Sequence, residues 1–313
     1  MTHTFFSKAF KGQNQWWRYL IMIIAIFLAT QLGSFPLAMV ASIKVITDGI
    51  ELNTSTLTDF KLLGIDPNIG LMLLALTFVT GMLAYILLFK PLHHRKVIDS
   101  ITGRNAFDWK RFFFAVFIWG SFMIISFFIG YMSNPGNFVL QFDPGKFIVL
   151  IFVSVVFIGI QSTFEEVVFR GYFMQGLGVL FKNAWIPVIL TSVVFGLMHY
   201  ANPEVTKFGA AILLPQYILL GLVFAVTVVM DEGLEIAIGV HVANNVLTSL
   251  LVTHESSVLK TTAIFSAKEI DPVYSLYELI ITSALFLAIM AYKYKWSNIK
   301  KLFIRLKPEI IEK

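Results

Sequence analysis

The 313-residue sequence contains no cysteine. This absence excludes disulfide bonds and thiol catalysis, and it leaves the redox compartment of the protein undetermined. Charged residues are also scarce, at 14% of the chain, whereas 57% of the residues are hydrophobic. The mean hydropathy of +0.78 reflects more apolar surface than one soluble core could bury. The composition therefore predicts an integral membrane protein.

The sequence also lacks the features that divide a chain into domains. It has no internal repeat, low-complexity tract or Gly/Ser-rich linker, so we expect residues 1–313 to form a single membrane domain. Most of its apolar runs are long enough for a bilayer core of about 30 Å, which needs about 20 helical residues. We therefore predict an all-α, polytopic membrane helical bundle with about eight transmembrane helices. The eight runs are 19–43, 70–89, 112–132, 146–164, 185–200, 208–230, 234–252 and 273–292, the fifth being the shortest.

Lysine and arginine collect before the first run, between the second and third runs, and after the eighth run. Such segments face the cytoplasm, so eight helices place both termini on the cytoplasmic side. The first run is too long for a removable signal peptide and is expected to remain as an anchor. The pI near 9.2 then reflects topology and contact with anionic membrane lipid, and no nucleic-acid partner is expected. The basic tail 292–307 is expected either as an interfacial helix or as a solvated tail.

Three ionisable residues stand at the end of the fourth run, in the stretch STFEEVVFRGY. An ionised group at the middle of a bilayer costs about 2.5 to 3.5 kcal/mol on insertion scales, so such groups usually have a partner and a function. On a helix, Glu166 and Arg170 are four residues apart and share a face, which predicts an ion pair. Glu165 points about 100° away and has no such neighbour.

Two later runs contain polar residues that could complete a site with Glu165. Phe195 and His199 lie four residues apart in the fifth run, and His241 and Asn245 lie four residues apart on one face of the seventh. If the fourth and fifth helices turn near residue 183, Glu165 and His199 stand at similar depth. His241 follows its own turn by only about eight residues, which predicts a depth mismatch on the order of 10 Å. Helix tilt, or a break at a glycine between 171 and 178, would remove this mismatch.

These residues form three motifs: EExxxR at 165–170, FxxxH at 195–199 and HxxxN at 241–245. Each motif alone is weak, but three in this order on membrane helices form a specific pattern. Over residues 147–252 the chain resembles the CPBP family, which includes the CAAX prenyl endopeptidases and the bacterial Abi proteins. The resemblance implies that this region is the catalytic core of an intramembrane endopeptidase that hydrolyses a peptide bond near the cytoplasmic side. We expect a bacterial cytoplasmic membrane as its location.

The resemblance also implies a role for each motif residue. A carboxylate in a poorly solvated place is more basic than in water, which suits a general base, and an uncharged NH2 group suits an oxyanion donor. The implied roles are activation of a water molecule (Glu165, His199), binding of the oxyanion (His241, Asn245), and support of the site (Glu166, Arg170, Phe195).

The metal requirement is open at this level. A catalytic zinc generally takes three protein ligands, for which the candidates are His199, His241 and Glu165. The chain lacks the HExxH pattern, and a metal-free mechanism uses the motif residues more completely, so we favour no cofactor and keep zinc as the alternative. His93 and His94 look like metal ligands, but we expect them in a solvated, lipid-facing basic loop.

Two other classes of function remain open. A non-catalytic scaffold or bacteriocin-immunity protein of the same family would keep the same motifs. A transporter would also place polar residues in its spans, but the inverted repeats or paired broken helices typical of transporters are not evident in the sequence. The expected partners are membrane lipid and a peptide or protein substrate.

Overall fold

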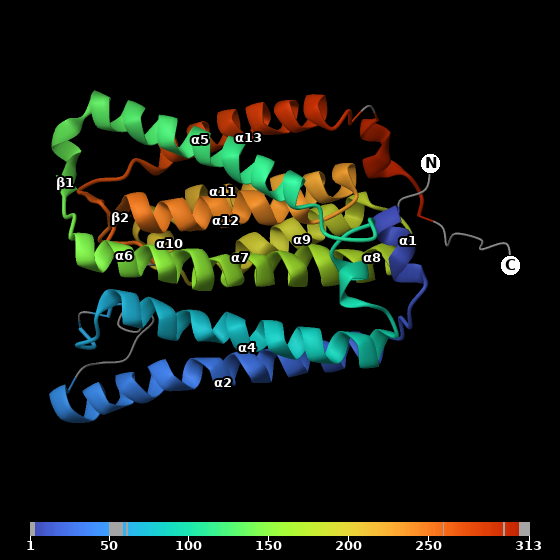
Figure 1. The fold of residues 1–313 in the computed structure, drawn as a ribbon, viewed down its shortest axis with the longest axis horizontal. Helices are drawn as coiled ribbons and strands as arrows, with labels where there is room; N and C mark the ends of the chain where they lie inside the picture. The colour runs from blue at the N-terminus through green and yellow to red at the C-terminus, as the bar shows by residue number, and fades with distance from the viewer. Residues whose placement is uncertain (1–3, 50–58, 61, 259, 297, 307–313) are drawn as a thin grey trace, which may run out of the picture.

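The computed structural model describes residues 4–49, 59–60, 62–258, 260–296 and 298–306. These residues form a bundle of long helices, with the short α1 (Thr4–Phe10) near the C-terminal segment at one end (Figure 1). A small three-stranded sheet lies at the opposite end. The predicted all-α membrane bundle is confirmed.

Each of the eight apolar runs forms a helix. Within the described residues, six helices are long and apolar enough to cross a bilayer, and the helices in the fifth and seventh runs are shorter, with 14 and 17 residues. At about 1.5 Å per residue these two span about 21 and 25 Å, less than a bilayer core. The eight are α2 (Trp16–Asp48), α4 (Pro67–His93), α5 (Trp109–Ser133), the segment Pro144–Phe181, α9 (Trp185–Met198), α11 (Ala210–Asp231), α12 (Glu235–Leu251) and α13 (Pro272–Lys293).

Three of these helices begin at an Asp-Pro pair. The side chains of Asp66, Asp143 and Asp271 accept hydrogen bonds from backbone N–H groups in the first turn. The proline that follows each of them has no N–H to satisfy and a φ already suited to a helix. Local sequence thus sets where α4, Pro144–Phe181 and α13 start.

The fourth run continues well beyond its predicted end. It comprises α6 (Pro144–Val153), the π-helical η3 (Ser154–Ile158), α7 (Gly159–Glu166), the π-helical η4 (Val167–Phe173) and α8 (Met174–Phe181). No break occurs at Gly171 or Gly178. A β-carbon would lie 2.8 Å from the Ser100 carbonyl oxygen at Gly171 and 2.6 Å from the Phe6 ring at Gly178. These glycines allow close packing, and the EExxxR stretch lies inside the helix.

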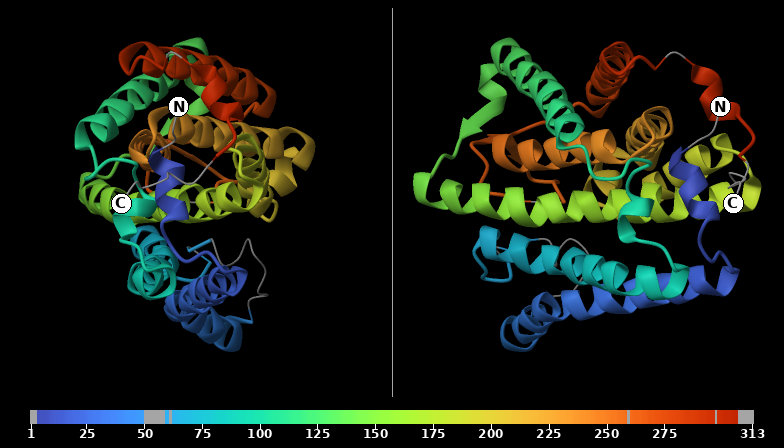
Figure 2. Two further views of the ribbon diagram at one scale, coloured as in Figure 1. Left: turned by 90° about the vertical axis from the view of Figure 1, so that its right-hand side faces the viewer. Right: turned by 45° about the vertical axis from the view of Figure 1, so that its right-hand side comes forward.

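α2 and α4 form an antiparallel hairpin beside the rest of the bundle (Figure 2). Gly33 permits their contact, since a β-carbon there would lie 2.5 Å from the Leu76 carbonyl oxygen. At the far end, β1 (Phe138–Leu140) pairs antiparallel with β3 (Phe265–Ala267), which pairs parallel with β2 (Val252–His254). This sheet ties the α5–α6 connection to the α12–α13 connection.

The end of the bundle that holds α1, the connection 95–108 and the C-terminal segment is called the basic end. Two expectations about it are wrong. The tail packs across the end of the bundle, through η5 (Ile299–Phe303) and a buried Leu306 whose N–H donates to the Lys182 carbonyl. His93 is fully buried, and its ring bonds the Tyr172 hydroxyl at 2.8 Å and the Gln13 carbonyl at 2.8 Å. His94 is exposed, as expected.

Candidate active site

Glu166 and Arg170 form the predicted ion pair inside the bundle. Arg170 Nη1 lies 2.8 Å from Glu166 Oε1, and both side chains are fully buried. Arg170 Nη2 also donates to the Gly221 carbonyl at 3.0 Å, and its guanidinium lies 4.3 Å from the centre of the Phe195 ring. A buried charge needs such partners to offset its lost hydration. Phe195 therefore supports the site as a surface on which the arginine packs.

His241 joins the two glutamates from the opposite helix. Its Nδ1 lies 2.8 Å from Glu166 Oε1, and its Nε2 lies 3.7 Å from Glu165 Oε2. Because a carboxylate only accepts, Nδ1 carries the hydrogen in the bond to Glu166. The ring of Phe224 stacks on the imidazole with centroids 4.8 Å apart. The orientation of Nε2 toward Glu165 is therefore set by the bond to Glu166 and by the stacking on Phe224.

The predicted depth mismatch of His241 is wrong. The expected mismatch assumed that the turn after α8 and the turn before α12 lie at the same depth in the membrane. The turn before α12 instead lies deeper than the end of α8. Leu234 packs against Gly171, and its N–H donates to the Ile101 carbonyl at 2.8 Å. From that shared level Glu165 is 6 residues away (171 − 165) and His241 is 7 (241 − 234), or about 9 and 10 Å.

His199 lies at the end of α9, as the residue that follows its last helical turn. Its Nδ1 bonds the Phe195 carbonyl at 2.8 Å, so Nδ1 carries the hydrogen and a neutral His199 has its lone pair on Nε2. Tyr217 of α11 stacks on the imidazole with centroids 4.2 Å apart. The Phe195 ring lies 4.9 Å from His199 and 5.8 Å from His241, so both histidines flank one aromatic ring.

Asn245 lies one turn after His241 and faces α7, where its Nδ2 donates to Ser162 Oγ at 3.2 Å. The structure thus brings the motif residues of α7, α9 and α12 together. It also adds residues that the motifs did not indicate. Gln161 donates to Glu165 Oε1 at 3.0 Å, and its spacing of four residues from Glu165 was a readable signal. Ser162 and Tyr217 gave no such signal.

Comparison with known proteins identifies a related family. Residues 144–247 match the family model described as type II CAAX prenyl endopeptidase, Rce1-like. This matched region, residues 144–247, is called the CAAX-protease domain. The family predicted from the three motifs is confirmed, and this domain contains the whole helix Pro144–Phe181 together with the motif residues of α9 and α12. The family is one of intramembrane CAAX-type proteases.

The likeness also extends beyond the CAAX-protease domain. The chain is 25% identical to the uncharacterized protein YyaK of Bacillus subtilis (strain 168) over 299 residues. The aligned region covers 95% of this chain and 98% of YyaK. No solved structure matches the chain significantly.

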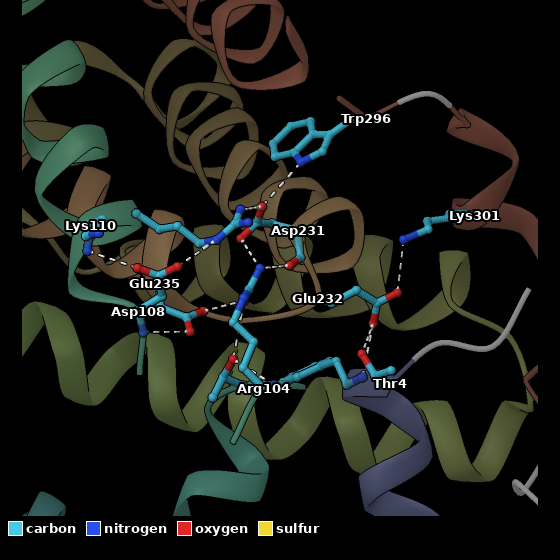
Figure 3. Close-up of polar contacts among 12 residues, drawn as sticks. Thr4, Arg104, Asp108, Lys110, Asp231, Glu232, Glu235, Trp296 and Lys301 are labelled. Carbon is cyan, nitrogen blue, oxygen red and sulfur yellow. Dashed lines mark hydrogen bonds and ion pairs between the residues drawn. The ribbon is translucent and has the colours of Figure 1, made fainter. Parts of the chain in front are cut away.

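The turn before α12 is held by a second charged cluster at the basic end of the CAAX-protease domain (Figure 3). Arg104 Nη2 lies 3.0 Å from Asp231 Oδ2, and its Nη1 lies 3.2 Å from Glu235 Oε2. Arg111 also pairs with Asp231, and the Trp296 indole N–H donates to the same carboxylate at 3.3 Å. These contacts hold the start of α12 against the connection 95–108. They thereby set the position of His241 along the bundle axis.

Zinc does not fit the side chains as they are placed. Throughout the described ranges, no group of three or more His, Asp or Glu side chains is arranged to hold a metal ion. The Nδ1 atoms of His241 and His199 are bonded to Glu166 and to the Phe195 carbonyl, so only the Nε2 atom of each ring is left as a possible ligand. We therefore derive no chemical step through a metal.

Proposed function

We propose that the protein is an intramembrane endopeptidase in which Glu165 is the general base. The observation that supports this assignment is the difference between the two adjacent glutamates. Glu166 is fully buried and its Oε1 binds both Arg170 and His241. Glu165 keeps 14% of its side chain exposed and accepts a hydrogen bond from the neutral amide of Gln161. Glu165 is thus the carboxylate that can reach a water molecule.

In the proposed reaction a water molecule lies between Glu165 and the Nε2 lone pair of His199. Glu165 takes a proton as the water oxygen attacks the carbonyl carbon of the peptide, and the electron pair of the C=O bond moves to the oxygen. The electron pair on the oxygen then re-forms the C=O bond as the C–N bond breaks, and the departing nitrogen takes up the proton that Glu165 accepted from the water. A base and an acid placed in this way each contribute typically 10² to 10⁴ in rate.

His241 and Asn245 are proposed to donate to the oxyanion. Because Nδ1 of His241 already donates to Glu166, donation from Nε2 to the oxyanion requires a second hydrogen on the ring. Asn245 Nδ2 has two hydrogens, of which one is directed at Ser162. Removal of one oxyanion donor typically costs about 10² to 10³ in rate.

We propose that cleavage occurs near the cytoplasmic side of a bacterial membrane, with both termini in the cytoplasm. Glu165 is 16 residues from Phe181 (181 − 165) and 21 from Pro144 (165 − 144), or about 24 and 32 Å along the helix. The site is therefore nearer the basic end of the bundle. The proposed partners are membrane lipid and a peptide or protein substrate, with no nucleic acid and no metal cofactor.

The deciding experiment compares purified wild-type protein with Glu165→Gln in liposomes, on a library of membrane-anchored peptides. We expect the wild-type protein to cleave some peptides and Glu165→Gln to lose at least about 10²-fold in rate. The control is Glu255→Gln, an exposed glutamate on the other end of the bundle. Equal cleavage by Glu165→Gln would disprove the assignment of the base. A wild-type protein that cleaves nothing would favour the non-catalytic scaffold or immunity protein.

A further inference from the structure

A chain of hydrogen bonds leads from α5 to Asn245. Trp119 is 3% exposed, and its indole Nε1 donates to Asn244 Oδ1 at 3.3 Å. Asn244 Nδ2 donates to Asn245 Oδ1 at 3.1 Å, and Asn245 Nδ2 donates to Ser162 Oγ at 3.2 Å. Trp119 lies outside the three motifs and Asn244 occupies an unspecified position of HxxxN, and neither touches the glutamates in the described contacts.

The direction of this chain follows from its first member. An indole N–H can only donate, so the oxygen of Asn244 faces Trp119 and its NH2 group faces Asn245. The oxygen of Asn245 then faces Asn244, and its own NH2 group faces α7. Ser162 could not impose this direction, because a hydroxyl both donates and accepts. Trp119 is therefore the group that decides which end of the Asn245 amide points into the site.

We propose that Trp119 and Asn244 are positioning residues that hold the NH2 group of Asn245 toward the oxyanion. This inference rests on the proposed endopeptidase function. The direction of the amide matters for the chemistry because a reversed amide would present its oxygen to a developing negative charge. An oriented dipole stabilises such a charge only if it is set before the reaction begins.

The packing of α5 on α12 holds this chain of hydrogen bonds in place. A β-carbon at Gly239 would lie 2.6 Å from the Phe112 carbonyl oxygen, so the two backbones approach at one helix crossing. The Trp119 ring lies edge to face on Phe286 of α13, with centroids 5.4 Å apart and an angle of 87°. The indole is thus held by Asn244 of α12 and by Phe286 of α13.

Two variants separate orientation from packing. Trp119→Phe keeps an aromatic ring and removes the donor, and we expect kcat to fall about tenfold with KM unchanged. Asn244→Asp keeps the shape but only accepts, so Asn245 turns its NH2 group toward residue 244 and away from the site. We expect a loss as large as that of Asn245→Ala, about 10² to 10³ in kcat. Trp109→Phe, an exposed tryptophan on the same helix, is the control.

A double-mutant comparison tests whether Trp119 acts through Asn245. In the Asn245→Ala background, Trp119→Phe is expected to cause no further loss of kcat. An equal tenfold loss in both backgrounds would show that Trp119 only packs, and would overturn the proposal. Unchanged kcat in Trp119→Phe would overturn it as well.

A second measurement does not depend on turnover. In protein labelled with ¹⁵N-asparagine and placed in lipid, the side-chain amide signal that disappears in Asn245→Ala identifies Asn245. We expect this signal to shift in Trp119→Phe and Asn244→Asp and to stay in place in Trp109→Phe. A signal that does not move overturns the positioning role. If it shifts in a protein that cleaves no peptide, the positioning role stands and the proposed function fails.

Discussion

His241 Nδ1 lies 2.8 Å from Glu166 Oε1, while Nε2 of the same ring lies 3.7 Å from Glu165 Oε2. One imidazole thus contacts two adjacent carboxylates through its two nitrogens. The two carboxylates differ in their other contacts, since Glu166 also binds Arg170 and Glu165 is partly exposed. Nδ1 of His241 is therefore occupied by Glu166, whereas Nε2 faces Glu165, the proposed base.

The Glu166–Arg170 pair is expected to matter for folding as well as for activity. Glu166→Gln or Arg170→Leu leaves a charge buried without its partner, which typically costs about 3 to 5 kcal/mol. We expect both variants to give less folded protein in detergent, measured by size-exclusion yield and thermal unfolding. Glu165→Gln should keep a nearly normal yield. Loss of activity in Glu166→Gln at full yield, together with active Glu165→Gln, would show that Glu166 is the base.

The crossing of α9 and α11 is expected to set the position of His199. A β-carbon at Gly196 would lie 2.3 Å from Ile218 Cγ1 and 3.0 Å from the Ile218 backbone nitrogen, so the helices would have to move apart. Overpacking of this kind typically costs about 1 to 3 kcal/mol. We expect Gly196→Ala to lower the cleavage rate more than tenfold. Gly159→Ala is the control, because a β-carbon there would meet no atom within 4 Å. Equal rates in the two variants would contradict this role.

The orientation in the membrane can be tested with single cysteines, since the chain has none of its own. Ala106 and Asn134 are exposed at opposite ends of α5. Ala106→Cys should react with an impermeant thiol reagent only after the membrane is opened, because it lies in a basic connection. Asn134→Cys should react in intact cells. The reverse pattern would invert the proposed orientation and the side of cleavage.

Metal dependence is tested by elemental analysis of active, detergent-purified protein beside His199→Ala and His241→Ala. We expect the wild-type protein to contain far less than one zinc per chain and to keep its activity in chelator. Near-stoichiometric zinc that is absent from both variants, with activity restored to the stripped enzyme by zinc, would refute the metal-free mechanism.

The helices and the Glu166–Arg170 pair could be predicted from the sequence because they depend on local spacing. Apolar runs, Asp-Pro starts and a separation of four residues are properties of a single helix. The recurrence of the three motifs in order was sufficient to indicate the family. For the same reason the prediction that Glu165 and Glu166 point in different directions required no tertiary information.

The height of His241 and the direction of the Asn245 amide were decided by tertiary structure alone. Leu234 meets Gly171 because Arg104 holds the turn at Asp231, across contacts between segments far apart in the chain. Trp119 reaches Asn244 across 125 residues. Periodicity reports which residues share a face of one helix, but it carries no information about how far that helix slides against its neighbours. Packing at close glycine contacts and buried ion pairs supplied that information here.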